Sequence, residues 1–143
     1  MEIISKSENE TCQLAQKVAA GLAPGETVAL YGDLGSGKTT FTKGLAKHLG
    51  IEKAITSPTF VIMKEYVVPE NPRGIVKLIH IDCYRMQTAD DAESIGIHEC
   101  LDSKNDVTIL EWPENISLIL TQYQVKKINF KYIDETTRKI TIE

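Results

Sequence analysis

Residues 32–39 combine closely spaced glycines with a lysine–threonine pair, a combination that binds phosphate in many proteins. They read G-D-L-G-S-G-K-T and satisfy the P-loop pattern G-x-x-x-x-G-K-[ST]. The glycines let the backbone curl so that successive N–H groups point into one concavity, where phosphate oxygens bind. We expect Lys38 to reach the β- and γ-phosphates and the hydroxyl of Thr39 to ligate Mg²⁺. The sequence therefore predicts a site for a nucleoside di- or triphosphate.

Two acidic residues are candidates for the chemistry at this loop. Asp82 and Glu111 each end an apolar run that is typical of a buried strand. Because the ligand crevice of an open α/β sheet lies outside the strand ends, both carboxylates are expected to face the γ-phosphate. In such sites one acid holds Mg²⁺ and another group orients the attacking water. The sequence does not decide which of the two acids has which role.

A hydroxyl-rich loop follows the predicted P-loop helix and is a candidate sensor of the γ-phosphate. Thr56 and Thr59 lie in the stretch T-S-P-T-F, which contains no lysine or arginine. Loops of this kind become ordered around a γ-phosphate and Mg²⁺ in switch proteins. The alternative interpretation is a proline turn with polar caps.

The segments around these residues have the patterns of helices and strands that would position them. A short β-rich segment, 26–31, ends at the P-loop, and 40–49 has apolar residues at helical spacing. The other predicted elements are a helix at 9–21 after an S-x-x-E capping box, a hairpin of strands 60–68 and 75–82, short helices within 88–95 and 97–102, a strand at 106–112, and a closing hairpin between 125 and 142. This order predicts a single α/β domain, 1–143, with a P-loop NTPase-like three-layer sandwich whose mixed central sheet includes antiparallel hairpins.

Composition narrows the class of protein. The 143 residues are 42% hydrophobic and 25% charged, which is typical of a globular domain in solution. A net charge of −4 argues against a broad basic face for nucleic acid, so any link to RNA is expected to be indirect. Three cysteines without a C-x-x-C motif argue against a disulfide framework or a zinc site. With no apolar run of about 18 residues, a cytoplasmic protein without a membrane partner is expected.

Two further groups of residues are not assigned to the site. The segment 103–106, S-K-N-D, resembles the guanine-reading signature [NT]-K-x-D, but it begins with serine and precedes a strand, so selectivity for GTP is not supported. His48, His80 and His98 are scattered over different elements. They are interpreted as ordinary packing or surface residues.

Five short motifs occur in an order that resembles one protein family. They are G-D-L-G-S-G-K-T at 32–39, T-S-P-T-F at 56–60, H-I-D-C-Y-R at 80–85, E-S-I-G at 93–96 and E-W-P at 111–113. With this set the chain resembles TsaE, the family of bacterial ATPases of tRNA threonylcarbamoyladenosine (t6A) biosynthesis. The resemblance implies ATP and Mg²⁺ as cofactors and a role in modifying the adenosine next to the anticodon. It also implies action on the TsaD–TsaB complex that transfers the threonylcarbamoyl group, through which tRNA is reached indirectly.

The resemblance also implies roles for particular residues. Thr39 and Glu111 would ligate Mg²⁺, and Asp82 would act in hydrolysis together with Lys38 and Glu111. Glu8 and Arg138 would contact the nucleotide. The residues implied to hold the phosphates are Gly35, Ser36, Gly37, Lys38, Thr39 and Thr40.

Two other functions remain open at this point. A small-molecule P-loop kinase would need an arginine-bearing lid, yet Arg85 is the only arginine between Asp82 and Glu111. A noncatalytic nucleotide-sensing adaptor would use the same loop without turnover.

Overall fold

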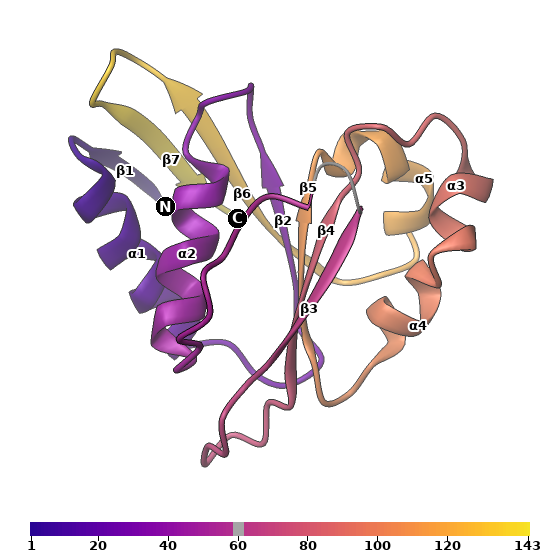
Figure 1. Cartoon of the computed structure of the whole chain (residues 1–143). Helices are drawn as coiled ribbons and strands as arrows, with labels where there is room; N and C mark the ends of the chain where they lie inside the picture. Colours follow the sequence, from indigo (N-terminus) through magenta and orange to yellow (C-terminus); the bar gives the residue numbers. More distant parts are fainter. Residues whose placement is uncertain (59–61) are drawn as a thin grey trace.

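The computed structural model describes residues 1–58 and 62–143, and a seven-stranded sheet runs through it (Figure 1). The strand order is β1-β7-β6-β2-β5-β4-β3. The elements are β1 (Glu2–Ser5), α1 (Glu8–Ala20), β2 (Thr27–Tyr31), α2 (Lys38–His48), β3 (Met63–Val67), β4 (Lys77–Asp82), α3 (Ala89–Ser94), α4 (Ile97–Asp102), β5 (Val107–Glu111), the 3-10 helix η1 (Pro113–Ile116), α5 (Ser117–Leu120), β6 (Val125–Tyr132) and β7 (Arg138–Ile142).

Parallel pairing dominates the middle of the sheet, and antiparallel pairing its edges. Strand β2 lies between β5 and β6 and pairs with both in parallel, and β4 pairs with β5 in parallel. The hairpins β3–β4 and β6–β7 are antiparallel, as the sequence predicts. Strand β1, which the sequence pattern does not predict, pairs antiparallel with β7. A strand of four residues has too few alternations to show a period of its own.

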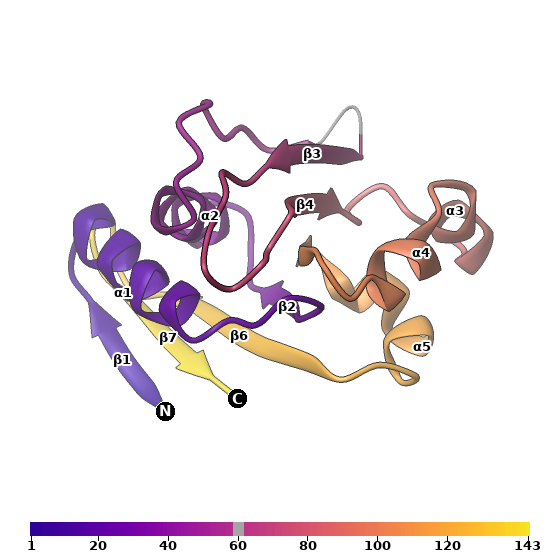
Figure 2. The same cartoon turned by 90° about the horizontal axis from the view of Figure 1, so that it is seen from below.

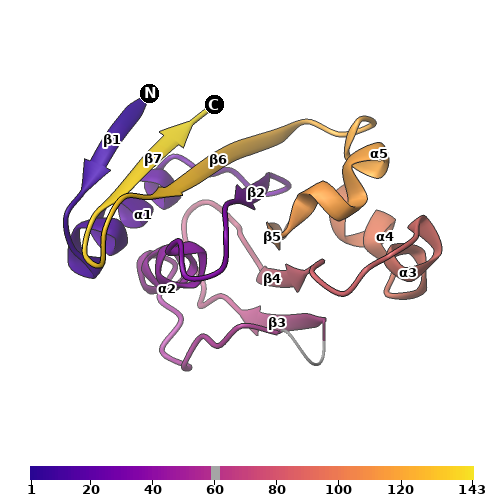
Figure 3. The same cartoon turned by 90° about the horizontal axis from the view of Figure 1, so that it is seen from above.

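Helices cover both faces of this sheet, so the predicted three-layer α/β arrangement with a mixed sheet is confirmed. Views from below and from above show α1 and α2 on one side and α3, α4 and α5 on the other (Figure 2, Figure 3). Successive side chains of a strand point to opposite faces. Ile109 accordingly packs in the cluster with α1 and α2, and Leu110 packs in the cluster with α3 and α4. Glu111, two residues after Ile109, therefore faces α2.

Hydrogen bonds at the first turn of α1 fix the residue at which this helix starts. The hydroxyl of Ser7 accepts a bond of 3.1 Å from the backbone N–H of Glu10, as expected of a capping box. The carboxylate of Glu10, however, accepts from the N–H of Lys6 at 2.6 Å, one residue earlier than the motif predicts. Both bonds satisfy backbone donors at the helix start that would otherwise lack a partner.

In the described parts of the chain, no helix has the length and hydropathy needed to cross a membrane.

Helices α1 and α2 approach closely at Gly44, and we expect Gly44→Ala to destabilise the fold. A Cβ at this position would lie 2.6 Å from the carbonyl oxygen of Cys12 and 2.9 Å from the Cβ of Ala15. Relieving this overlap should cost about 1–3 kcal/mol, more than the roughly 1 kcal/mol that alanine gains over glycine in a helix. Urea unfolding measures the difference in the free energy of unfolding.

Gly21→Ala is the matched control for this substitution. At Gly21 the φ angle is −94°, and the nearest atom to an added Cβ is 3.6 Å away. Alanine should therefore leave the stability unchanged or raise it slightly. Equal stabilities of the two variants would contradict the close approach of α1 and α2.

Candidate nucleotide-binding site

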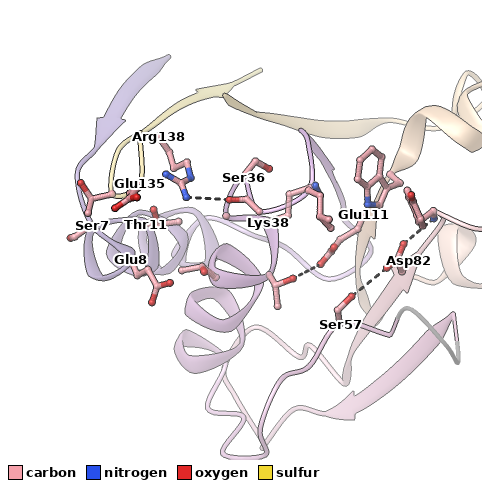
Figure 4. A pocket seen from close by; sticks show the side chains of 18 residues that line it. Ser7, Glu8, Thr11, Ser36, Lys38, Ser57, Asp82, Glu111, Glu135 and Arg138 are labelled. Atoms are coloured by element: carbon pink, nitrogen blue, oxygen red, sulfur yellow. Dashed lines mark hydrogen bonds between the residues drawn. The ribbon is translucent and has the colours of Figure 1, made fainter. Parts of the chain in front are cut away.

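A pocket of about 660 Å³ lies at the carboxyl ends of β2, β4 and β5, over the first turn of α2 (Figure 4). Its volume is in the usual range for small-molecule sites. Its lining comes from the P-loop with the start of α2, the start of α1, the loop before β3, the ends of β4 and β5, and the β6–β7 turn. The residues are Ser7, Glu8, Thr11, Leu34, Gly35, Ser36, Gly37, Lys38, Thr39, Thr40, Ser57, Asp82, Tyr84, Glu111, Trp112, Glu135, Thr136 and Arg138.

The P-loop backbone has the shape that phosphate binding requires. Gly32, Gly35 and Gly37 have φ angles of 146°, 74° and 107°, which side-chain-bearing residues rarely adopt. Helix α2 begins directly after this loop, so its first N–H groups lie where an anion binds. The hydroxyl of Ser36 is buried and has no hydrogen-bond partner in the described parts of the chain. An orphaned buried hydroxyl in such a loop fits a phosphate oxygen as its missing partner.

Lys38 provides a partly desolvated cation next to the loop. Its ammonium group donates hydrogen bonds to the carbonyl oxygens of Gly32 and Asp33, the second at 2.9 Å. It lies 4.4 Å from the centroid of the Trp112 ring. Burial lowers the pKa of the Lys38 ammonium, and the nearby carboxylates, Glu111 foremost, act in the opposite direction. A charge removed from water in this way interacts more strongly with a phosphate than an exposed lysine does.

The two strand-end acids lie side by side in the pocket. Asp82 and Glu111 are register partners across β4 and β5, and both are buried. The hydroxyl of Thr39 lies 3.4 Å from Oε1 of Glu111. A hydroxyl and a carboxylate are oxygen ligands of the kind that Mg²⁺ prefers. The donor set therefore fits the metal that accompanies a nucleotide.

Asp82 accepts hydrogen bonds from two segments, the turn that follows it and the loop before β3. Its Oδ1 accepts a 2.9 Å bond from the backbone N–H of Tyr84, and its Oδ2 accepts a 3.3 Å bond from the hydroxyl of Ser57. Ser57 belongs to the hydroxyl-rich loop in which the sequence pointed to Thr56 and Thr59. Thr56 does not line the pocket, and its hydroxyl accepts from Lys64. Thr59 lies outside the described residues.

The opposite wall of the pocket carries the two outlying positions that the family resemblance indicated. Arg138 donates from Nη2 to the carbonyl oxygen of Gly35 at 3.1 Å. Its Nη1 donates to the carbonyl oxygens of Asp134 and Thr137. Glu8 lies at the start of α1 on the same wall. The arginine thus ties the β6–β7 hairpin to the P-loop, although 103 residues separate it from Gly35.

Sequence reasoning did not assign His80 to the site. Its side chain is fully buried, and Nε2 lies 2.9 Å from Oε1 of Glu111. The signal that could have found it is its place two residues before Asp82 on the same strand. At that spacing both side chains point to the same face of the sheet.

The fold and this site together define the class of protein, one with the P-loop NTPase-like α/β fold. The structure resembles the crystal structure titled "Crystal structure of Bacillus subtilus YdiB" with a TM-score of 0.76 and 33% identity, covering 99% of this chain and 83% of that one. Residues 5–140 match the family described as "Threonylcarbamoyl adenosine biosynthesis protein TsaE". The chain belongs to the TsaE family.

Two relatives illustrate how completely the similarity covers the chain. Both are named tRNA threonylcarbamoyladenosine biosynthesis protein TsaE. The protein of Bacillus subtilis (strain 168) is 41% identical over 132 residues, which are 92% of this chain and 78% of that protein. The protein of Treponema pallidum (strain Nichols) is 36% identical over 142 residues, which are 99% of each. The similarity therefore includes the pocket and is not limited to the P-loop.

We expect the fluorescence of Trp112, the only tryptophan, to change when Mg-ATP is added. Its ring lines the pocket, lies beside the Lys38 ammonium and packs against the Tyr84 ring at a tilt of 55°, with 5.0 Å between centroids. A phosphate that draws the ammonium toward itself changes the electrostatic environment of the indole. Titration of the intrinsic emission measures the effect, and Trp112→Phe gives the background. A flat titration under conditions where calorimetry shows binding would contradict this placement.

Proposed function

We propose that the protein is a Mg²⁺-dependent ATPase that supports t6A modification of tRNA by acting on the TsaD–TsaB complex. In this proposal residues 1–143 work as one ATPase domain, and tRNA is reached only through the partner proteins. The observation that carries the proposal is the pocket itself. It joins a glycine-shaped phosphate cradle with an orphaned buried hydroxyl to a lysine, a threonine and two strand-end carboxylates.

The phosphates would be held by backbone and side-chain donors of residues 35–40. The glycine conformations already shape the backbone of this segment, so donors such as the buried Ser36 hydroxyl would bind phosphate with little rearrangement. Lys38 supplies a point charge to the same oxygens. On the opposite wall, Glu8 and Arg138 would contact the rest of the nucleotide.

Thr39 and Glu111 would hold Mg²⁺, and Asp82 would orient the attacking water. Mg²⁺ bound there would neutralise the negative charge on the transferred phosphoryl group. Asp82 suits the second role because its carboxylate is fixed by Tyr84 and Ser57 and lies in register with Glu111. Hydrolysis needs such a positioned water more than it needs a strong base.

The pocket is short of free cations, which is why we propose that turnover depends on the partners. Among the described residues that line it, only Lys38 and Arg138 carry a positive side chain. Arg138 already donates to three backbone carbonyl oxygens. The stretch 56–60 contains no lysine or arginine. A dispersed phosphoryl-transfer transition state gains from one more cation or from an ordered loop, and a partner can supply either.

The test is phosphate release by the purified chain alone, then with TsaD and TsaB, and then with tRNA added. We expect a slow rate alone and an increase of about a hundredfold or more in the complex, since a transition-state arginine contributes roughly 10³ to 10⁵. A high rate that is indifferent to every addition would reject partner dependence. No phosphate release under any condition, with nucleotide bound, would reject the ATPase in favour of a sensing adaptor. A phosphorylated small molecule among the products would indicate a kinase.

A further inference from the structure

The proposed roles give no function to His80, a buried polar residue beside the site. His80 lies on β4, on the same face as Asp82 and one step deeper into the sheet. Its side chain is fully buried, and its Nε2 is 2.9 Å from Oε1 of Glu111. The same oxygen lies 3.4 Å from the hydroxyl of Thr39. His80, Glu111 and Thr39 therefore form one chain of contacts that runs from the core to the pocket.

The hydrogen-bond partners define which nitrogen of His80 carries hydrogen. An ionised carboxylate only accepts hydrogen bonds, so the bond to Glu111 places a hydrogen on Nε2. Nδ1 is buried and has no partner in the described ranges 1–58 and 62–143. A second hydrogen there would be an unpaired buried donor, which costs about 1–3 kcal/mol. The Nε2–H of the ring therefore points at Glu111.

We propose that His80 is a positioning residue, which holds the Glu111 carboxylate beside the Thr39 hydroxyl so that the two oxygens are preset for Mg²⁺. This inference rests on the Mg²⁺ site of the proposed function. A buried carboxylate needs a hydrogen-bond donor. Without His80 the Lys38 ammonium, which is close enough to Glu111 for their charges to interact, would compete for the carboxylate. Outer-shell partners that fix a metal ligand in this way strengthen metal binding.

The test measures metal affinity directly, with Mn²⁺ as the probe and electron paramagnetic resonance of free Mn²⁺ as the readout in the presence of ADP. We expect His80→Leu to weaken Mn²⁺ binding by about tenfold or more. We expect His80→Gln to retain most of the affinity, because its side-chain N–H reaches close to the position of Nε2. ADP affinity in EDTA should be the same in parent and variants, since His80 does not line the pocket.

A matched control is His98→Leu. His98 is hydrogen-bonded to Tyr123 and lies outside the pocket, so this variant should bind Mn²⁺ like the parent. If His80→Leu does not fold, His80→Asn serves, because its shorter amide stays polar but falls short of Glu111. If His80→Leu, or His80→Asn in its place, binds Mn²⁺ as tightly as the parent, the proposed role of His80 is overturned. Equal losses of metal-free ADP affinity and Mn²⁺ affinity would also overturn it, in favour of a purely structural role. A parent that binds ADP but no Mn²⁺ would instead overturn the Mg²⁺ site.

Discussion

The Asp82→Asn and Glu111→Gln variants should each lose partner-stimulated ATP hydrolysis by about 10² to 10³-fold while still binding nucleotide. Both substitutions are nearly isosteric and remove only a charge, and removing one preorganised electrostatic group from a site costs a factor of this size. The two acids are buried side by side, so water cannot replace the lost charge effectively. The measurement is phosphate release with TsaD and TsaB, beside calorimetric nucleotide binding.

The two variants should also differ from each other. Glu111→Gln should weaken the Mg²⁺ dependence of nucleotide binding, because Glu111 is bonded to Thr39, whereas Asp82→Asn should leave it unchanged. Asp102→Asn and Glu52→Gln, at exposed positions outside the pocket, are the matched controls. Hydrolysis at the parent rate in both pocket variants would show that the strand-end acids are structural.

We expect Lys38→Ala to lower ATP affinity by about a hundredfold, because hydrogen bonds to a charged group contribute roughly 1.5–3 kcal/mol each. Lys38 is only 5% exposed, so no solvent counterion replaces it well. Thr39→Ala should affect mainly the Mg²⁺ dependence. Calorimetric titration with a nonhydrolysable ATP analogue, with and without Mg²⁺, separates the two effects.

Lys43→Ala is the control for the loss of a lysine from α2, because Lys43 is exposed on the same helix. Its affinity for ATP should equal that of the parent. Circular dichroism and thermal unfolding show whether the Lys38 variant is folded. Unchanged affinity in a folded Lys38→Ala protein would contradict the P-loop as the phosphate site.

Features that depend on neighbouring residues could be predicted from the sequence alone. The P-loop follows from glycine spacing within eight residues, and the structure shows the positive φ angles that this spacing predicts. The Ser7 cap, the helices α1 and α2 and both hairpins depend equally on local patterns, so their prediction was close. Asp82 and Glu111 could be placed together because parallel strands end at one edge of a sheet.

The tertiary structure decided what depends on distant pairing. Strand β1 is a strand only because β7 lies next to it, and the order of the seven strands follows from packing that no local period records. His80 reaches Glu111 across 31 residues, and Arg138 reaches Gly35 across 103. A histidine in a strand has the same local pattern whether it packs in the core or donates to a carboxylate. Only the residue that the fold sets opposite it makes the difference.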